Sequence, residues 1–121
     1  MAPGALWITA RAFGSDGSAL ESWLHAAMQW VVDPGPGCVP PDVVINSWGT
    51  SSGSTDNFRP DAQALRAAGI VAPFAAGNSG PNASTVGAPA AYPEALAVGA
   101  VASDDRVATF SSRGPSVWYG R

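Results

Sequence analysis

The stretch Ile70-Val71-Ala72-Pro73-Phe74-Ala75-Ala76-Gly77-Asn78-Ser79-Gly80 decides the fold that we expect for this chain. Its apolar first part predicts a short buried strand, and its Gly-Asn-Ser-Gly end predicts a turn that follows the strand directly. Ligands bind at the carboxyl ends of the strands in open α/β sheets. The turn would therefore present the carboxamide of Asn78 where an N–H donor can stabilise a developing oxyanion.

Predicted strands and helices alternate on both sides of this stretch. We expect strands at 6–13, 42–48, 70–76, 95–101 and 107–110, a first helix that begins at the capping box Ser18-Ala19-Leu20-Glu21, and a second helix over Asn57–Ala68. Apolar residues recur at helical spacing in the first helix, at Leu20, Trp23, Leu24, Ala27, Met28 and Val31. Pro60 suits the first turn of the second helix and Gly69 its end. This order predicts an α/β fold with parallel strands joined by crossover helices.

Composition limits the classes of function. The chain has 121 residues, of which 46% are hydrophobic and 12% charged, so we expect one globular domain over 1–121 without a dividing linker. A net charge of −3 provides no basic surface for nucleic acid. No apolar run reaches the length of about 18 residues that a membrane helix needs, and Met1–Arg11 does not resemble a signal peptide. Cys38 is the only cysteine, which excludes an internal disulfide.

Three motifs in order carry a resemblance to a known family. They are Asn46-Ser47-Trp48-Gly49, Ala75-Ala76-Gly77-Asn78 and Phe110-Ser111-Ser112-Arg113-Gly114-Pro115-Ser116. Together they resemble the subtilisin-like serine proteases (subtilases), most of all the bacillopeptidase F type. The resemblance implies a subtilisin-like three-layer fold with a mostly parallel sheet flanked by helices, of which this chain would be an incomplete portion. It also implies a polypeptide substrate, no cofactor, and a parent protein that is secreted or attached to the cell envelope.

The resemblance assigns three roles to residues of this chain. Asn78 would donate to the oxyanion of the tetrahedral intermediate. Ser47, Trp48 and Gly49 would line the strand that pairs with substrate, and Ala75, Ala76 and Gly77 would form the floor of the deepest side-chain pocket. Two structural alternatives stay open. An Asn-Ser-Gly turn commonly means only that asparagine tolerates a left-handed backbone and caps itself, and Trp48 could simply fill the core.

The resemblance also implies a cis peptide bond before Pro89 and a weak cation site near the carbonyls of Ala90, Tyr92 and Ala95. Calcium takes six to eight oxygen ligands, and no carboxylate of this stretch completes such a shell. We therefore expect no metal.

The catalytic triad has no counterpart in the sequence. A subtilase carries its Asp, His and Ser in Asp-Ser/Thr-Gly, His-Gly-Thr and Gly-Thr-Ser-Met-Ala motifs, and none of these is present. His25 stands in a predicted helix without such a motif. Gly49-Thr50-Ser51-Ser52-Gly53 matches the nucleophile elbow of α/β-hydrolases, but no helix is predicted directly after it. We expect a fragment of a serine endopeptidase that is inactive alone; the alternatives are a non-catalytic, peptide-binding subtilase remnant and an unrelated α/β binding domain.

Overall fold

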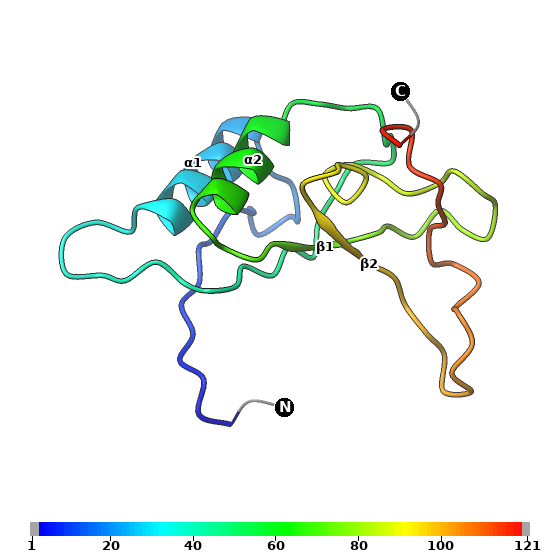
Figure 1. The fold of residues 1–121 in the computed structure, drawn as a ribbon, viewed down its shortest axis with the longest axis horizontal. Helices are drawn as coiled ribbons and strands as arrows, with labels where there is room; N and C mark the ends of the chain where they lie inside the picture. The colour runs from blue at the N-terminus through cyan, green and yellow to red at the C-terminus, as the bar shows by residue number, and fades with distance from the viewer. Residues whose placement is uncertain (1–2, 120–121) are drawn as a thin grey trace. The chain divides into compact units, whose positions relative to one another are not determined.

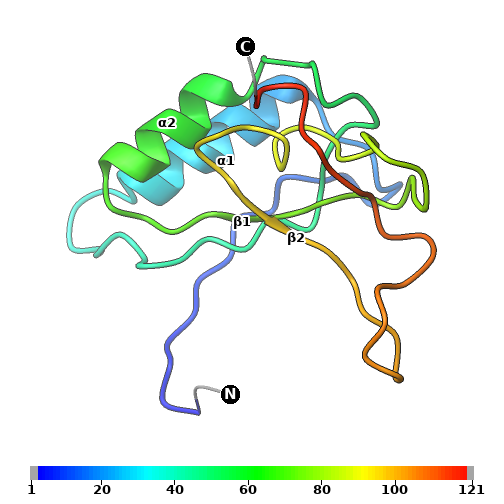
Figure 2. The same cartoon turned by 45° about the vertical axis from the view of Figure 1, so that its right-hand side comes forward.

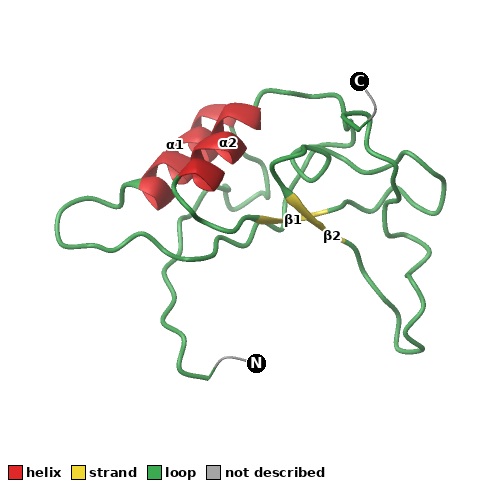
Figure 3. Ribbon diagram, in the orientation of Figure 1, coloured by secondary structure: helices red, strands yellow, loops and turns green. Residues whose placement is uncertain are grey.

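The computed structural model describes residues 3–119 (Figure 1). The expected start of the chain at Met1 and Ala2, and its last residues Gly120 and Arg121, lie outside the described residues. Contacts divide the chain into two compact units, Met1–Pro40 and Pro41–Arg121. The boundary falls between Pro40 and Pro41, at the end of a stretch rich in proline and glycine. Loops make up most of the described chain, and its helices and strands are short (Figure 3).

The first unit contains one helix in its described part, α1 (Glu21–Val32). Its buried residues are Leu24, Met28 and Val31, which recur at spacings of four and three. They confirm the centre of the predicted apolar stripe, whereas Leu20 and Trp23 are exposed.

The capping box predicted for α1 is wrong. The residue before the helix is Leu20, and no side chain caps the first turn. Ser18 instead donates its hydroxyl and its N–H to Asp16 Oδ1, at 2.8 and 3.0 Å. These bonds, the one from the N–H first, hold the pKa of the Asp16 carboxyl below its usual value. The local turn thus competes successfully for the serine that would otherwise cap the helix.

The strand predicted at 6–13 is also wrong. The described chain forms no strand there, and the side chains of Leu6 and Trp7 are 99% and 81% exposed. A strand needs a neighbour to satisfy its backbone groups, and these residues form no backbone ladder with another described segment. The apolar sequence is therefore not enough to form a strand in this chain.

The second unit begins its regular structure with α2 (Arg59–Ala67), which confirms the second predicted helix to within two residues at either end. Pro60 lies in the first turn. Gly69 follows the helix with φ +78°, and the N–H of Ile70 donates to the Leu65 carbonyl at 2.9 Å. Glycine is favoured there because other residues adopt a positive φ at a cost.

The sheet of the second unit is parallel, as predicted. Strand β1 (Pro73–Ala75) pairs with β2 (Leu96–Val98), and the two lie side by side in Figures 1 and 2. On the other side of β1, residues 43–46 run parallel through single bridges between Val43 and Val71 and between Asn46 and Phe74. The predicted strands are thus present in shortened form, and the strand predicted at 107–110 is reduced to one antiparallel bridge between Val101 and Val107.

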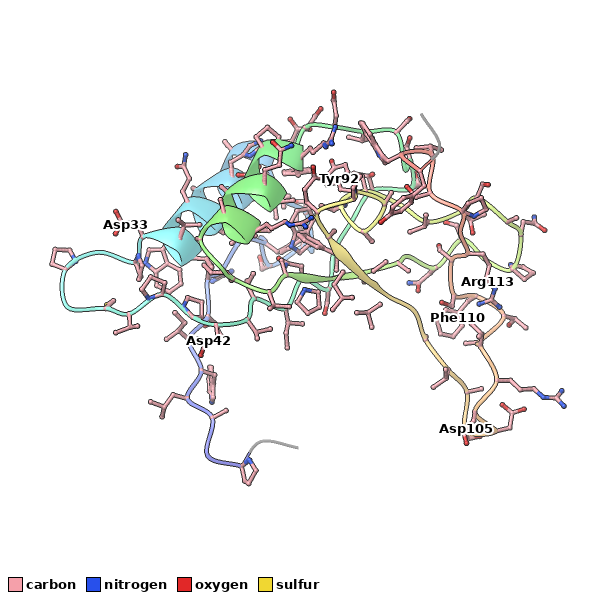
Figure 4. All side chains as sticks on the ribbon, viewed as in Figure 1. Asp33, Asp42, Tyr92, Asp105, Phe110 and Arg113 are labelled. Carbon is pink, nitrogen blue, oxygen red and sulfur yellow. The ribbon has the colours of Figure 1, made fainter. Side chains whose placement is uncertain are left out.

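One face of this sheet is covered within the unit. Phe74 of β1 is 2% exposed, and Leu65 of α2 and Tyr92 of the long loop are buried with it. Helix α2 lies over this side of the sheet in both ribbon views, and Tyr92 lies next to α2 in Figure 4. Arg59 at the start of α2 forms an ion pair of 3.0 Å with Glu94, two residues before β2. An ion pair as well as apolar packing therefore holds α2 to the segment that leads into β2.

The opposite face is apolar and open. Exposed aliphatic side chains come from all three parallel segments: Val43, Ile45, Val71, Leu96 and Val98. A shallow hollow of about 350 Å³ lies on this face. Parallel sheets are normally covered on both faces. In the second unit, only one of the two faces has its cover.

Candidate functional site

The turn predicted to carry the site follows β1 directly. Gly77 has φ +103°, and a Cβ built on it would lie 3.0 Å from the Ser112 hydroxyl oxygen. Both facts require glycine, since other residues are strained at positive φ and a side chain would press on Ser112. The sharp change of direction after the strand is therefore encoded by this one residue.

Asn78 stands at the exposed tip of the turn. The φ of Asn78 is not positive. The residue of the turn that has a positive φ is Gly77. Its carboxamide forms no hydrogen bond with any residue of the described range 3–119. The self-capped, left-handed asparagine of the structural alternative is thus not the geometry found here, and the two N–H groups of the carboxamide are available to a ligand.

The turn is held from behind by a distant segment. The Ser79 N–H donates to Ser112 Oγ at 3.0 Å, and the Ser112 N–H donates to the Gly77 carbonyl at 2.9 Å. The Gly80 N–H donates to the Phe110 carbonyl at 2.8 Å. Phe110 lies on the same stretch as Arg113 in Figure 4. In the sequence, residues 110–116 served only as a motif of the resemblance, and no spacing signal linked them to the turn.

The two predicted substrate segments lie side by side. The Ala75 N–H donates to the Asn46 carbonyl at 3.0 Å, which sets the 43–46 segment beside β1. Gly49 lies against two backbone carbonyls, since a Cβ there would be 3.0 Å from the Ala88 oxygen and 4.0 Å from the Ala75 oxygen. The structure therefore brings Ser47-Trp48-Gly49 and Ala75-Ala76-Gly77 together at the carboxyl ends of adjacent parallel segments.

The predicted pocket residues do not share one hollow. Ser47 and Ala75 line the 350 Å³ hollow on the open face, together with Val43, Ile45, Asn46, Pro73, Phe74 and Val98. Ala76 is buried, and Trp48, Gly49, Gly77 and Asn78 are not part of the lining. The hollow therefore contains only part of the predicted pocket floor, since Ala76 and Gly77 do not line it.

Trp48 packs inward. Its ring meets Phe58 edge-to-face at 5.0 Å between centroids and Phe74 at 5.8 Å. Aromatic pairs favour this geometry. The alternative in which Trp48 fills the core thus describes its side chain well, and only its backbone remains for pairing with a peptide.

The nucleophile-elbow match is not supported by the local structure. Ser51 lies in an exposed loop, and the following helix begins only at Arg59. An elbow runs directly from its serine into a helix. The loop proline that was expected to follow a cis bond does so, at Ala88–Pro89.

The Arg59–Glu94 ion pair links α2 to the segment before β2. The hydrogen bonds from Arg59 hold the pKa of the Glu94 carboxyl below its usual value, and the Gln63 amide adds a further bond at 3.1 Å. Burial raises the pKa of the Tyr92 hydroxyl, which donates to the Thr55 carbonyl at 2.7 Å.

Across residues 3–119, no three His, Cys, Asp or Glu side chains gather as metal ligands would. None of the described helices has the length and apolar character to cross a bilayer.

Comparison with known proteins places this arrangement. The family model of peptidase S8, the subtilase family, matches residues 1–121. The chain is 40% identical to bacillopeptidase F of Bacillus subtilis (strain 168), with 96% of this chain and 9% of that protein covered. It is 37% identical to subtilisin amylosacchariticus of Bacillus subtilis subsp. amylosacchariticus, covering 94% and 29%. The solved structure of sphericase superposes with a TM-score of 0.73 at 30% identity, covering 85% of this chain and 34% of that one.

These matches identify the structure as an incomplete α/β fold of the subtilisin-like class. The chain belongs to the subtilase family, which confirms both the predicted family and the predicted fold. It spans less than a third of the length of these two curated relatives.

Proposed function

We propose that residues 1–121 are part of one catalytic domain of a serine endopeptidase, in which Asn78 donates to the oxyanion. The observation that supports this role is the exposed Asn78 carboxamide, unbonded within the described chain, on a glycine-hinged turn at the carboxyl end of β1. A donor that is fixed in place before the reaction stabilises developing charge without a reorganisation cost.

The reaction would proceed through an acyl-enzyme. A base takes the proton of a serine hydroxyl as the serine oxygen attacks the peptide carbonyl carbon, and the C=O π electron pair moves onto the carbonyl oxygen. The Asn78 amide N–H stabilises that oxyanion until the C–N bond breaks, when the base returns its proton to the leaving amine. The three triad motifs are absent from these 121 residues. The nucleophile and the base would therefore come from other parts of the catalytic domain.

The substrate would be an extended polypeptide. The N–H of Val44 donates to the Val71 carbonyl, just before β1, and the N–H of Asn46 donates to the Pro73 carbonyl in β1, at 2.9 Å each. Alternate residues of such a parallel segment turn their backbone groups toward the other side, where a peptide strand can add. Ser47-Trp48-Gly49 would pair with the peptide, and the small residues Ala75-Ala76-Gly77 would leave room for its side chain.

A chimera tests the role of Asn78. Residues 1–121 replace the matching segment of bacillopeptidase F, and peptide hydrolysis is measured before and after Asn78→Ala. We expect kcat to fall about 10²–10³-fold with little change in KM, a range known for this donor in a subtilisin and carried over from the family. Asn82→Ala, an exposed asparagine of the neighbouring loop, is the control. An unchanged kcat in the Asn78 variant would contradict the proposal.

The 121-residue chain alone should hydrolyse a fluorogenic peptide no faster than the background. The reason is that its sequence offers no triad nucleophile and base. Activity of the purified chain that disappears on mutating Ser51 or His25 would show this expectation to be wrong.

The second candidate function is a non-catalytic peptide-binding module. The outer side of the 43–46 segment favours it, because a peptide could bind there without any chemistry. Binding of an extended peptide to the chain, followed through a change in tryptophan fluorescence that is lost in Trp48→Phe, together with an inactive chimera, would support this function. A triad in the reading frame that surrounds these codons would favour the enzyme.

A further inference from the structure

Ser112 contacts the Asn78 turn on both sides of its tip. Its hydroxyl oxygen accepts from the N–H of Ser79, and its own N–H donates to the carbonyl of Gly77. The two distances are 3.0 and 2.9 Å. One residue thus holds both chain neighbours of Asn78.

The carboxamide of Asn78 has no hydrogen bond of its own within the described residues. Its direction therefore depends on the backbone that carries it. Catalytic groups need placement to within about 0.5 Å, which their supporting residues provide. The hydrogen bonds of Ser112 to Gly77 and Ser79 are the contacts best placed to hold the Asn78 backbone in position.

Burial makes Ser112 a firm support. Its side chain is 7% exposed, and its oxygen lies 3.0 Å from the position of a Cβ on Gly77. A hydrogen bond shielded from water competes less with solvent than one at the surface. The turn is therefore seated on Ser112 by close packing as well as by two hydrogen bonds.

We propose that Ser112 is a positioning residue for the oxyanion donor, because its two bonds fix the backbone on either side of Asn78. This inference rests on the proposed function of Asn78. It gives the Phe110–Ser116 motif a role in catalysis through the turn, although no residue of the motif would touch the substrate.

Ser111 provides a matched control. It is the neighbouring residue, it is 1% exposed, and its hydroxyl oxygen also accepts from a backbone N–H, that of Ala100 at 3.1 Å. Ser111→Ala and Ser112→Ala thus remove the same atom from the same buried segment. Only Ser112→Ala removes a bond to the turn that carries Asn78, the one from the Ser79 N–H, and it leaves the backbone bond to Gly77 in place.

Hydrogen exchange on the full 121-residue chain tests the contact itself. We expect Ser112→Ala to speed exchange of the Ser79 N–H at least tenfold and Ser111→Ala to leave it unchanged. Equal protection of the Ser79 N–H in both variants would overturn the proposal.

A double-mutant cycle in the bacillopeptidase F chimera tests the catalytic role. Ser112→Ala should lower kcat about tenfold with little change in KM, as expected for a misplaced catalytic group. It should have almost no further effect in the Asn78→Ala background, because the group that it positions is then gone. Ser111→Ala should leave kcat within about twofold.

The outcomes separate the two proposals. A silent Asn78→Ala overturns the proposed function. An effective Asn78→Ala with a Ser112→Ala loss that is the same in both backgrounds overturns only the positioning role. If Ser112→Ala does not fold, Ser112→Cys keeps the size and a weaker acceptor, and the same cycle is run with it. An additive cycle with Ser112→Cys overturns the positioning role equally.

Discussion

The two faces of the sheet in the second unit are built by the same strands and differ in how far their side chains are exposed. On the covered face, Phe74 is 2% exposed and packs edge-to-face against Trp48, whose ring also contacts Phe58 just before α2. On the open face, Ile45 is 78% exposed and Val98 is 50% exposed, beside a shallow apolar hollow. Apolar residues occupy both faces because parallel strands are normally buried on both. The difference shows that the sequence pattern specifies two covers, of which the second unit supplies one.

The comparison separates stability from surface chemistry. Side chains on the covered face hold the unit together by the area they remove from water. Side chains on the open face contribute little to the folded unit alone, and they leave an apolar patch that favours association. Mutations on the covered face should therefore lower the free energy of unfolding, whereas mutations on the open face should mainly change self-association.

The largest effect is expected on the covered face. Phe74→Ala should lower the free energy of unfolding by about 3–5 kcal/mol, the usual cost of removing a buried aromatic ring. Val98→Ala on the open face is the control, and it should cost less than about 1 kcal/mol. Urea unfolding measured by tryptophan fluorescence gives both values. Similar losses at the two positions would contradict the comparison.

Trp48 should follow as the next largest loss. Its edge-to-face contacts with Phe58 and Phe74 place it on the covered face, although it is only half-buried. Trp48→Ala should therefore cost about 2–3 kcal/mol, and Trp48→Phe clearly less, because part of the aromatic packing is kept. Circular dichroism melts of the two variants measure the difference. If Trp48→Ala lowered the free energy of unfolding by less than Val98→Ala does, Trp48 would not contribute to the packing of the covered face.

The ion pair between Arg59 and Glu94 predicts how acid weakens the covered face. The pKa of Glu94 is lower in the folded chain than its ordinary value of 4.5. A lowered folded pKa stabilises the fold above the unfolded pKa and loses that stabilisation as pH falls through the folded one. Stability should thus decline below about pH 4.5. The decline should be shallower in Glu94→Gln, as measured by melting temperature against pH; parallel curves would exclude this pair as a source.

The smallest effect on stability is expected on the open face. Ile45→Lys should change the free energy of unfolding by no more than about 0.5 kcal/mol, since the side chain is already in water. Self-association of the chain should fall, because a charge interrupts the apolar patch. Light scattering over a range of concentrations measures this. Unchanged association would show that the open face is not its cause.

Local signals predicted the parts of the fold whose causes are local. Pro60 and Gly69 bound α2 correctly, and the apolar run before Gly77 does become β1. The capping box was predicted wrongly because the Ser18 hydroxyl donates to Asp16 instead of capping the helix. The spacing of residues in the sequence does not show this competing hydrogen bond. The strand at 6–13 failed because pairing requires a neighbour, and that is a property of the assembled sheet.

The candidate site shows the same limit. Gly77 and Asn78 are read directly from the turn, since glycine at positive φ has a local cause. The inward packing of Trp48 depends on Phe58 and Phe74, and so it needed the structure. The support from Ser112 depends on a contact across more than thirty residues, for which no periodicity gives a signal.

The fastening of the Asn78 turn also sets an order on biosynthesis. Residues 77–80 leave the ribosome before Phe110 and Ser112, so the turn must wait for its partners while β1 and α2 are already available. Contacts between distant residues close late because the connecting loop must first lose its freedom. A nascent chain that ends before residue 110 would thus carry Asn78 on an unfastened turn, and the rim of the site would be completed only when the Phe110–Ser112 segment arrives.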